Sequence, residues 1–342
     1  MKDLGRRGLL TTAASALFAP RTGRAQDNSL IITTYGGSWE TFWREQIVPR
    51  FVARTGASVS LDVGFGRTFS SALRAAGPGG TDYSVLMMND IFVEPLCTGG
   101  NFEKLDMDLL PHACNLYDVA YAEHGMALTA MISPIGIGYR TDLVKTPPSC
   151  WRDLWTNPEF RGRIGLYNVQ NSVGKAFVCL AGRLFGKGPE DMDGAFSALV
   201  RLGPVLQTDF NMSTMMGTGE IVVAPFDFGE IARLRRQGLP VDCVMPQEGM
   251  LMWDQTFTIC AQARSRTLAY RYLDFIFEPE IQLMLAETFF VSPVSRAVKI
   301  PPSLAKDVPV TGDHMASIIS TDWHWANENA ATLDARWSHV FG

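Results

Sequence analysis

Residues 30–39, LIITTYGGSW, begin as an apolar, β-branched run and end in two glycines followed by serine and tryptophan. A run of this kind predicts a buried strand, and the glycines predict a sharp turn at its carboxyl end. Large apolar side chains then recur at spacings of mostly three and four: Trp39, Phe42, Trp43, Ile47, Phe51 and Val52. That period is typical of an amphipathic helix, with Ser38 as the expected N-cap and Gly56 as the expected stop. The chain therefore opens with a strand–loop–helix unit.

The same alternation continues downstream. We predict a strand over 57–63, a helix over 68–76 and another buried strand over 82–88. Strands that alternate with helices indicate a parallel α/β sheet, in which ligands bind beyond the carboxyl ends of the strands. One candidate cleft is therefore bordered by three loops, at residues 35–38, 64–68 and 89–91.

A second α/β unit begins near Pro134. Its predicted strands are 135–139, 162–167 and 221–225, with a helix after the second and another, over 229–237, after the third. The chain then returns to the first unit with a strand over 256–260 and a helix over 268–277. We therefore predict four parts: a removable segment 1–25, lobe 1 from 27–133 and 256–300, lobe 2 from 134–255, and a helical segment 301–342 packed on the lobes.

The first 25 residues have the plan of a secretory signal. A basic start at Lys2, Arg6 and Arg7 precedes eleven mostly apolar residues, 9–19, which are too few to span a bilayer that needs about 20. Residues 23–25, GRA, place small side chains at the −3 and −1 positions of a cleavage site. The adjacent arginines resemble a twin-arginine signal, and the alternative is a general-secretion signal. We expect export to the periplasm.

Composition and charge exclude several classes of protein. Of the 342 residues, 46% are hydrophobic and 19% are charged, which supplies two large cores and excludes a disordered chain. The net charge is −5, and it becomes −9 without residues 1–25, which carry five of the basic residues and one of the acidic ones. We find no basic patch for nucleic acid. The six cysteines are scattered, so one disulfide stays open but no zinc or redox motif is predicted.

Several short motifs occur in the order and spacing of a known family. They are YGGSW at 35–39, PIGIGY at 134–139, WRDLW at 151–155, PQEG at 246–249 ahead of Trp253, and YRYLDFIFEPE at 270–280. In these motifs the chain resembles the periplasmic solute-binding proteins of ABC importers, in particular the spermidine/putrescine-binding type. The resemblance implies a two-lobed α/β fold of the type II periplasmic-binding class with a ligand cleft between the lobes. It also implies capture of a small amine or polyamine and delivery to a membrane permease, by a monomer without a cofactor.

The resemblance further implies which residues meet the ligand. Trp253 falls at the family's cation-stacking tryptophan. The carboxylate expected two positions later is replaced by Gln255, while Asp254 stands one residue early and would point to the opposite face of an extended strand.

Other positions also depart from the family. Residues 168–172, NVQNS, lack its acidic pair, and Asn89 replaces a hydroxyl; Asp227, Glu40 or Asp90 could supply the missing charge. The alternative role for Asp227 is the N-cap of the helix over 229–237. The candidate ligand-binding residues are Tyr35, Ser38, Asn89, Asn168, Asp227, Trp253, Asp254 and Gln255.

Other ligands and other classes of protein are also compatible with parts of this sequence. Because the carboxylates are incomplete, a mono-amine, an amino-acid-like or carboxylate solute, or a ferric ion stays open, and Arg67 is either a carboxylate clamp or a surface arginine. A ligand-sensing module for a receptor would have the same sequence features. A hydrolase would need a nucleophile elbow or paired catalytic carboxylates, and the sequence has neither motif, so we predict no enzyme.

Overall fold

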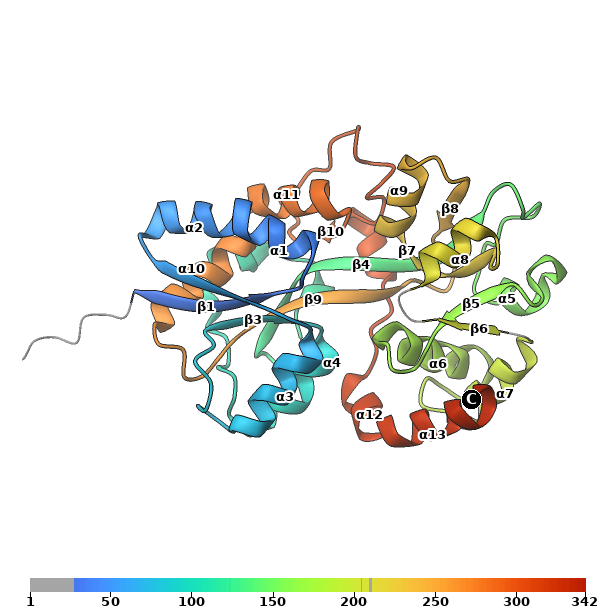
Figure 1. Ribbon diagram of the computed structural model, residues 1–342, viewed down its shortest axis with the longest axis horizontal. Coiled ribbons are helices and arrows are strands. Elements are labelled where there is room, and N and C mark those ends of the chain that lie inside the picture. Colours follow the sequence, from blue (N-terminus) through green and yellow to red (C-terminus); the bar gives the residue numbers. More distant parts are fainter. Residues whose placement is uncertain (1–27, 123, 204, 209–210) are drawn as a thin grey trace, which may run out of the picture.

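The computed structural model describes residues 28–122, 124–203, 205–208 and 211–342, so the predicted signal at 1–25 lies outside the described residues. Two α/β lobes share one sheet, and two long strands, β4 (Ala127–Arg140) and β9 (Leu251–Ile259), run from one lobe to the other (Figure 1). The predicted lobe boundaries at 133/134 and 255/256 fall inside these strands, and they stay predictions.

Lobe 1 is built on parallel strands in the order β2–β1–β3. The strands are β1 (Ser29–Thr34), β2 (Ser58–Val63) and β3 (Val85–Met88). The helices are α1 (Ser38–Phe42), α2 (Val48–Thr55), α3 (Gly66–Ala76), α4 (Asp90–Val93), α10 (Arg266–Ile276) and α11 (Pro279–Phe289). The predicted alternation is confirmed. The third strand begins later than predicted because the residues before it bend, and there the Tyr83 hydroxyl donates to Asp62.

The first helix differs from its prediction in two details. A π-helical turn, Trp43–Ile47, separates α1 from α2, just before Pro49, which has no N–H to donate within a regular helix. The expected cap at Ser38 is wrong: Gly37, with φ 67°, occupies the capping position, and Ser38 makes no capping hydrogen bond. The expected stop is confirmed, because Gly56 adopts the left-handed conformation at φ 66°.

Lobe 2 continues the sheet through β4, β7, β5 and β6. Its strands are β5 (Ile164–Tyr167), β6 (Val205–Thr208), β7 (Val223–Asp227) and β8 (Val241–Val244), and β10 (Ser292–Pro293) also pairs with β4. The helices are α5 (Asp153–Thr156), α6 (Ser172–Phe185), α7 (Met192–Arg201), α8 (Met212–Thr218) and α9 (Phe228–Arg236). The sequence did not predict α7, α8, α11, β6 or β8.

The chain ends in two helices, α12 (Trp323–Glu328) and α13 (Ala330–Phe341), which contact both lobes. The Asn327 amide donates to the carbonyl of Ile91 in lobe 1 at 3.0 Å. Nζ of Lys175, in α6, lies 3.7 Å from Oδ1 of Asp334 in α13. The end of the chain therefore bridges the lobes on the side where α4 and α6 face one another (Figure 1).

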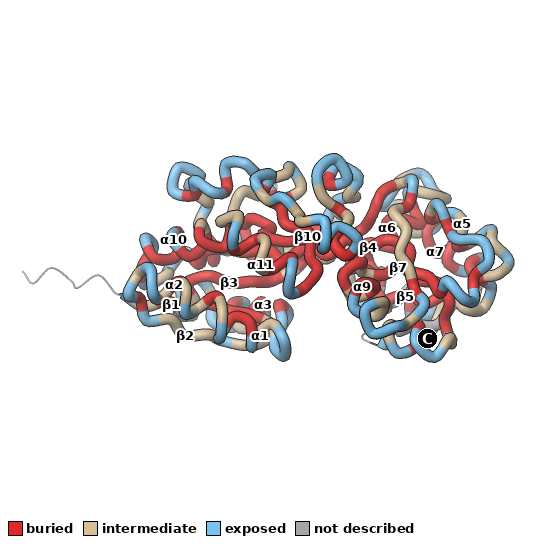
Figure 2. The backbone as a smooth tube through the Cα atoms, turned by 90° about the horizontal axis from the view of Figure 1, so that it is seen from above, coloured by how far each residue is buried: buried red, intermediate tan, exposed pale blue. Residues whose placement is uncertain are grey.

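The core follows the sheet. Figure 2 shows buried residues running through both lobes, with exposed residues at the outer turns and helix faces. Every residue of β4 is buried, as expected for a central strand covered on both faces. Trp43, Phe51 and Tyr272 centre the lobe 1 core, and Trp151 and Phe226 the lobe 2 core. None of the helices in the described part of the chain is long and apolar enough to cross a membrane.

Candidate ligand-binding site

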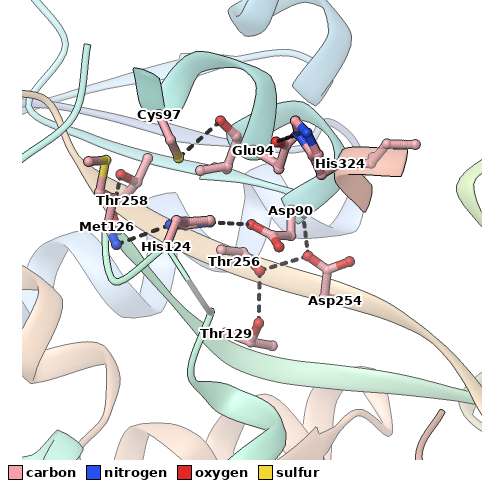
Figure 3. Close-up of polar contacts among 12 residues, drawn as sticks. Asp90, Glu94, Cys97, His124, Met126, Thr129, Asp254, Thr256, Thr258 and His324 are labelled. Carbon is pink, nitrogen blue, oxygen red and sulfur yellow. Dashed lines mark hydrogen bonds and ion pairs between the residues drawn. The ribbon is translucent and has the colours of Figure 1, made fainter. Parts of the chain in front are cut away.

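Asp254 lies on β9, just beyond the carboxyl end of β3, where the chain passes between the lobes. Met88, the last residue of β3, pairs with Thr256, and the Asn89 amide then donates to the backbone carbonyl of Asp254. The Asp254 side chain turns toward α4, where Oδ2 accepts the N–H of Asp90, and it also accepts the Thr256 hydroxyl at 2.7 Å (Figure 3). The carboxylate is thus fixed through one oxygen only.

The other oxygen of Asp254 has no partner. Asp254 is 1% exposed, and its Oδ1 is buried without a hydrogen bond. Burial, and after it the negative charge of Asp90, raises the pKa of Asp254 to about 6, although the Thr256 hydroxyl and backbone N–H groups act in the opposite direction. No described lysine or arginine pairs with it. Buried carboxylates are normally paired, because an isolated buried charge is costly.

Three other buried polar atoms without hydrogen-bond partners lie at the end of β1 and in the middle of β9. They are Oγ1 of Thr34, the hydroxyl of Tyr35 and Oε1 of Gln255. Tyr35 directly follows β1, and burial, followed by the charge of Asp254, raises the pKa of its hydroxyl. Its ring meets Trp39 edge-on at 5.7 Å, and Trp39 stacks on Phe289. The end of β1 and the middle of β9 together present acceptors that the described residues do not use.

Trp253 faces lobe 2 instead. Its Nε1 donates to Oδ1 of Asn171 at 3.2 Å, and its ring meets Tyr167 at 5.1 Å between centroids, with 67° between the planes. Asn168, in the same β5–α6 loop, accepts the N–H of Gln170 at 2.9 Å. The side chains of the neighbouring residues Trp253 and Asp254 therefore point toward opposite lobes. The predicted strand is wrong in starting at residue 256, because β9 already begins at Leu251.

Asp227 and Ser38 stand apart from Asp254. The alternative role predicted for Asp227 is confirmed, because its Oδ1 accepts the N–H of Gly229 at 2.8 Å and caps α9. Burial raises the pKa of Asp227 to about 6, opposed by that N–H and by Arg233. Ser38 is exposed at the start of α1. The described contacts of Asp254 include neither residue.

Two residues of the site were missed by sequence reasoning. Thr256 bonds Asp254 from the same strand, and its spacing of two residues, which places both on one face, is a signal that could have found it. His124 contacts Asp90 from 34 residues away, and no motif surrounds it.

Arg67 is exposed and reaches across to the Gln170 carbonyl in lobe 2 at 3.2 Å. All six cysteines are described and none forms a disulfide.

Asp227 gives a prediction about stability. We expect Asp227→Ala to unfold at lower denaturant than Asp227→Asn by about 1 kcal/mol in free energy, because asparagine keeps a capping oxygen and alanine does not. Both variants lose the same buried charge, so their difference isolates the cap. Urea unfolding measures it, and equal stability of the two variants would remove Asp227 from the capping role.

Asp254 gives a prediction about pH. Its folded-state pKa of about 6 lies above the value of about 4 in an unfolded chain. Its contribution to the free energy of unfolding is therefore complete below pH 4 and is lost as the pH rises through 6, by about 3 kcal/mol. Compared with Asp254→Asn, the ligand-free wild type should lose stability between pH 4 and 7. A difference that stays constant over that range would contradict the assigned environment.

Two lobes linked by crossing strands, with buried acceptors at the link, are the features of a receptor for a small solute. Residues 84–313 match the family described as bacterial extracellular solute-binding protein, and the chain belongs to that family. The predicted class and α/β fold are thereby confirmed, and the family consists of binding proteins and not of hydrolases.

Individual relatives agree with this assignment. A spermidine/putrescine-binding periplasmic protein of Escherichia coli (strain K12) is 24% identical over 320 residues, covering 88% of each chain. A putrescine-binding periplasmic protein of the same organism is 25% identical over 327 residues, covering 87% of this chain and 86% of its own. Among solved structures, an ABC transporter protein from Clostridium perfringens superposes with a TM-score of 0.82 at 22% identity, covering 92% of this chain and 100% of its own.

Proposed function

We propose that this protein is the periplasmic substrate-binding component of an ABC importer, and that it captures a small solute through an ammonium group and delivers it to the permease. The curated relatives are named as polyamine-binding periplasmic proteins, which supports the compartment and the ligand class. The basic, apolar and small-residue order of residues 1–25 supports export.

The observation that carries the ligand class is the unpartnered Oδ1 of Asp254. Asp334 offers a comparison within the same chain: its Oδ1 is also buried without a hydrogen bond, but the Lys175 ammonium lies 3.7 Å away. Asp254 has no such cation among the described residues. Leaving an ionised carboxylate buried alone costs several kcal/mol, and a ligand ammonium group would remove that cost.

The neighbours of Asp254 suit an ammonium group. A primary ammonium has three N–H donors, and Asp254, Tyr35 and Gln255 each carry an oxygen that no described residue uses. We infer that Asp254 and Tyr35 receive the amine, and that Trp253, with Gln255 on the same face of β9, lies along the rest of the ligand, where the indole ring face favours a second positive charge. Asn89 holds β9 in place, Asn168 shapes the loop opposite, and Asp227 caps α9.

A calorimetric panel tests the function. The purified protein is titrated with putrescine, spermidine and butylamine, and with succinate as a solute of similar length that has no nitrogen. We expect heat of binding with at least one amine and none with succinate, and we expect the bound amine to be recovered unchanged. Binding of succinate alone would favour the carboxylate alternative, and chemical conversion of the amine would contradict a receptor.

A further inference from the structure

A chain of hydrogen bonds leads away from Asp254 to His124 (Figure 3). Asp90 donates its backbone N–H to Oδ2 of Asp254 and presents its own carboxylate to His124, with 3.0 Å between Oδ1 and Nε2. Nδ1 of His124 in turn accepts the backbone N–H of Met126 at 3.1 Å. On the other side, the hydroxyl of Thr256 donates to Asp254 and therefore accepts from Thr129 at 2.8 Å.

These contacts determine which of the two carboxyl oxygens of Asp254 can carry a proton. Oδ2 already accepts two hydrogen bonds, from Asp90 and from Thr256. Oδ1 accepts none and is buried. A proton on the carboxyl group therefore sits on Oδ1, which is also the oxygen proposed to accept the ligand's N–H. The two cannot occupy it together.

The contacts also fix the form of His124. Because Nδ1 accepts an N–H, it carries no hydrogen, so Nε2 carries one and donates it to Asp90. His124 in this arrangement is a neutral donor. It stabilises the negative charge of Asp90 through a hydrogen bond and adds no positive charge of its own.

Asp90, in α4, is the charged group that acts on Asp254 among the described residues. The other groups near it are uncharged hydroxyls, those of Thr256 and Thr129 on the crossing strands and that of Tyr35 after β1. Burial and Asp90 together raise the pKa of Asp254 to about 6. The strength with which Asp90 repels charge on Asp254 depends on the hydrogen bond that Asp90 receives from His124.

We propose that a proton and the ligand's ammonium group compete for Oδ1 of Asp254, and that His124, acting through Asp90, is the positioning residue that sets the pH of this competition. The proposal rests on the proposed function. On binding, the O–H bond at Oδ1 breaks, the proton leaves to solvent, and the resulting carboxylate accepts an N–H of the ammonium group, which keeps its own charge. The receptor therefore holds its ligand near neutral pH and releases it in acid.

Two substitutions of His124 separate its two contacts. Glutamine reaches the position of Nε2 and keeps a donor to Asp90, whereas asparagine keeps an acceptor at the position of Nδ1 for Met126 but is too short for Asp90. We expect His124→Gln to behave as wild type. In His124→Asn, Asp90 loses its donor and repels charge on Asp254 more strongly, so Asp254 should hold its proton to a higher pH.

The proton is measured without any ligand. Carbon-13 NMR of aspartate carboxyl groups follows the titration, with Asp254 identified by its absence in Asp254→Asn. The midpoint should lie near pH 6 in wild type and His124→Gln, and higher in His124→Asn. Equal midpoints in all three would overturn the role of His124, whatever the protein binds.

The competition is measured with putrescine by calorimetry at pH 7 and pH 5, in two buffers of different ionisation enthalpy that are not amines. We expect affinity to fall about tenfold from pH 7 to pH 5, and binding near pH 6 to release about half a proton per site. Binding that is equal at both pH values, with no proton released, would overturn the competition while leaving amine binding itself established. No putrescine binding at any pH would overturn the proposed amine site, and the competition with it.

Discussion

Asp254→Asn is expected to weaken putrescine binding by about 100-fold or more, which corresponds to ~3 kcal/mol. Asparagine keeps the size of the side chain and an oxygen for the N–H of Asp90, but it removes the negative charge and places an N–H₂ group where Oδ1 would meet the ammonium. Calorimetric titration at pH 7.5 measures the loss.

A matched control removes a charge elsewhere. Asp118 is fully exposed, so Asp118→Asn lowers the acidic charge of the protein by the same amount and should leave putrescine affinity unchanged. The Asp254 variant should also be more stable than wild type at pH 7 without ligand, because it no longer buries a lone carboxylate. Equal affinities in wild type and Asp254→Asn would exclude Asp254 as the ammonium-binding residue.

Trp43→Ala is expected to lower the free energy of unfolding by about 3–5 kcal/mol. Trp43 is fully buried in the π-helical turn between α1 and α2, and its ring packs against Trp39 and Phe42. Its Nε1 donates to the hydroxyl of Tyr272, in α10, at 2.9 Å. The substitution therefore opens a large cavity and removes a hydrogen bond between distant segments of lobe 1. Urea unfolding followed by circular dichroism measures it.

Tyr272→Phe provides the graded control. It deletes only the hydroxyl oxygen, leaves Trp43 with a buried, unpaired N–H, and should cost about 1–3 kcal/mol. The alanine variant should therefore be clearly the less stable of the two. A loss below 1 kcal/mol in Trp43→Ala would mean that this side chain is not part of the lobe 1 core.

Local sequence patterns predicted most of the fold. The period of the apolar residues found the helix that begins beside Trp39, and the alternation of strands and helices found both lobes. Some elements were missed, including α11, where the buried polar residue Gln282 interrupts the helical period of the apolar residues. The cap at Ser38 was misplaced by one residue, because Gly37 can adopt the positive φ that the turn needs.

The site was less predictable than the fold. The family pattern drew attention to Trp253 and to the shift from Gln255 to Asp254, but the meaning of that shift depends on what Asp254 touches. Its partner Asp90 lies 164 residues earlier and reaches it only because β3 ends where β9 crosses between the lobes. His124 enters the same network through a single contact with Asp90. Such long-range contacts leave no local signal in one sequence.

We expect this receptor to recognise a positive charge, and the most direct test compares two ligands of one shape. Putrescine and 1,4-butanediol have the same four-carbon chain, but only putrescine is charged at neutral pH. Thermal unfolding of the protein at pH 7.5 should shift upward with putrescine, by about 3 kcal/mol of stability at a hundredfold excess over Kd, and should not move with the diol. An equal shift with both ligands, or a shift with the diol alone, would contradict recognition of the ligand by its positive charge.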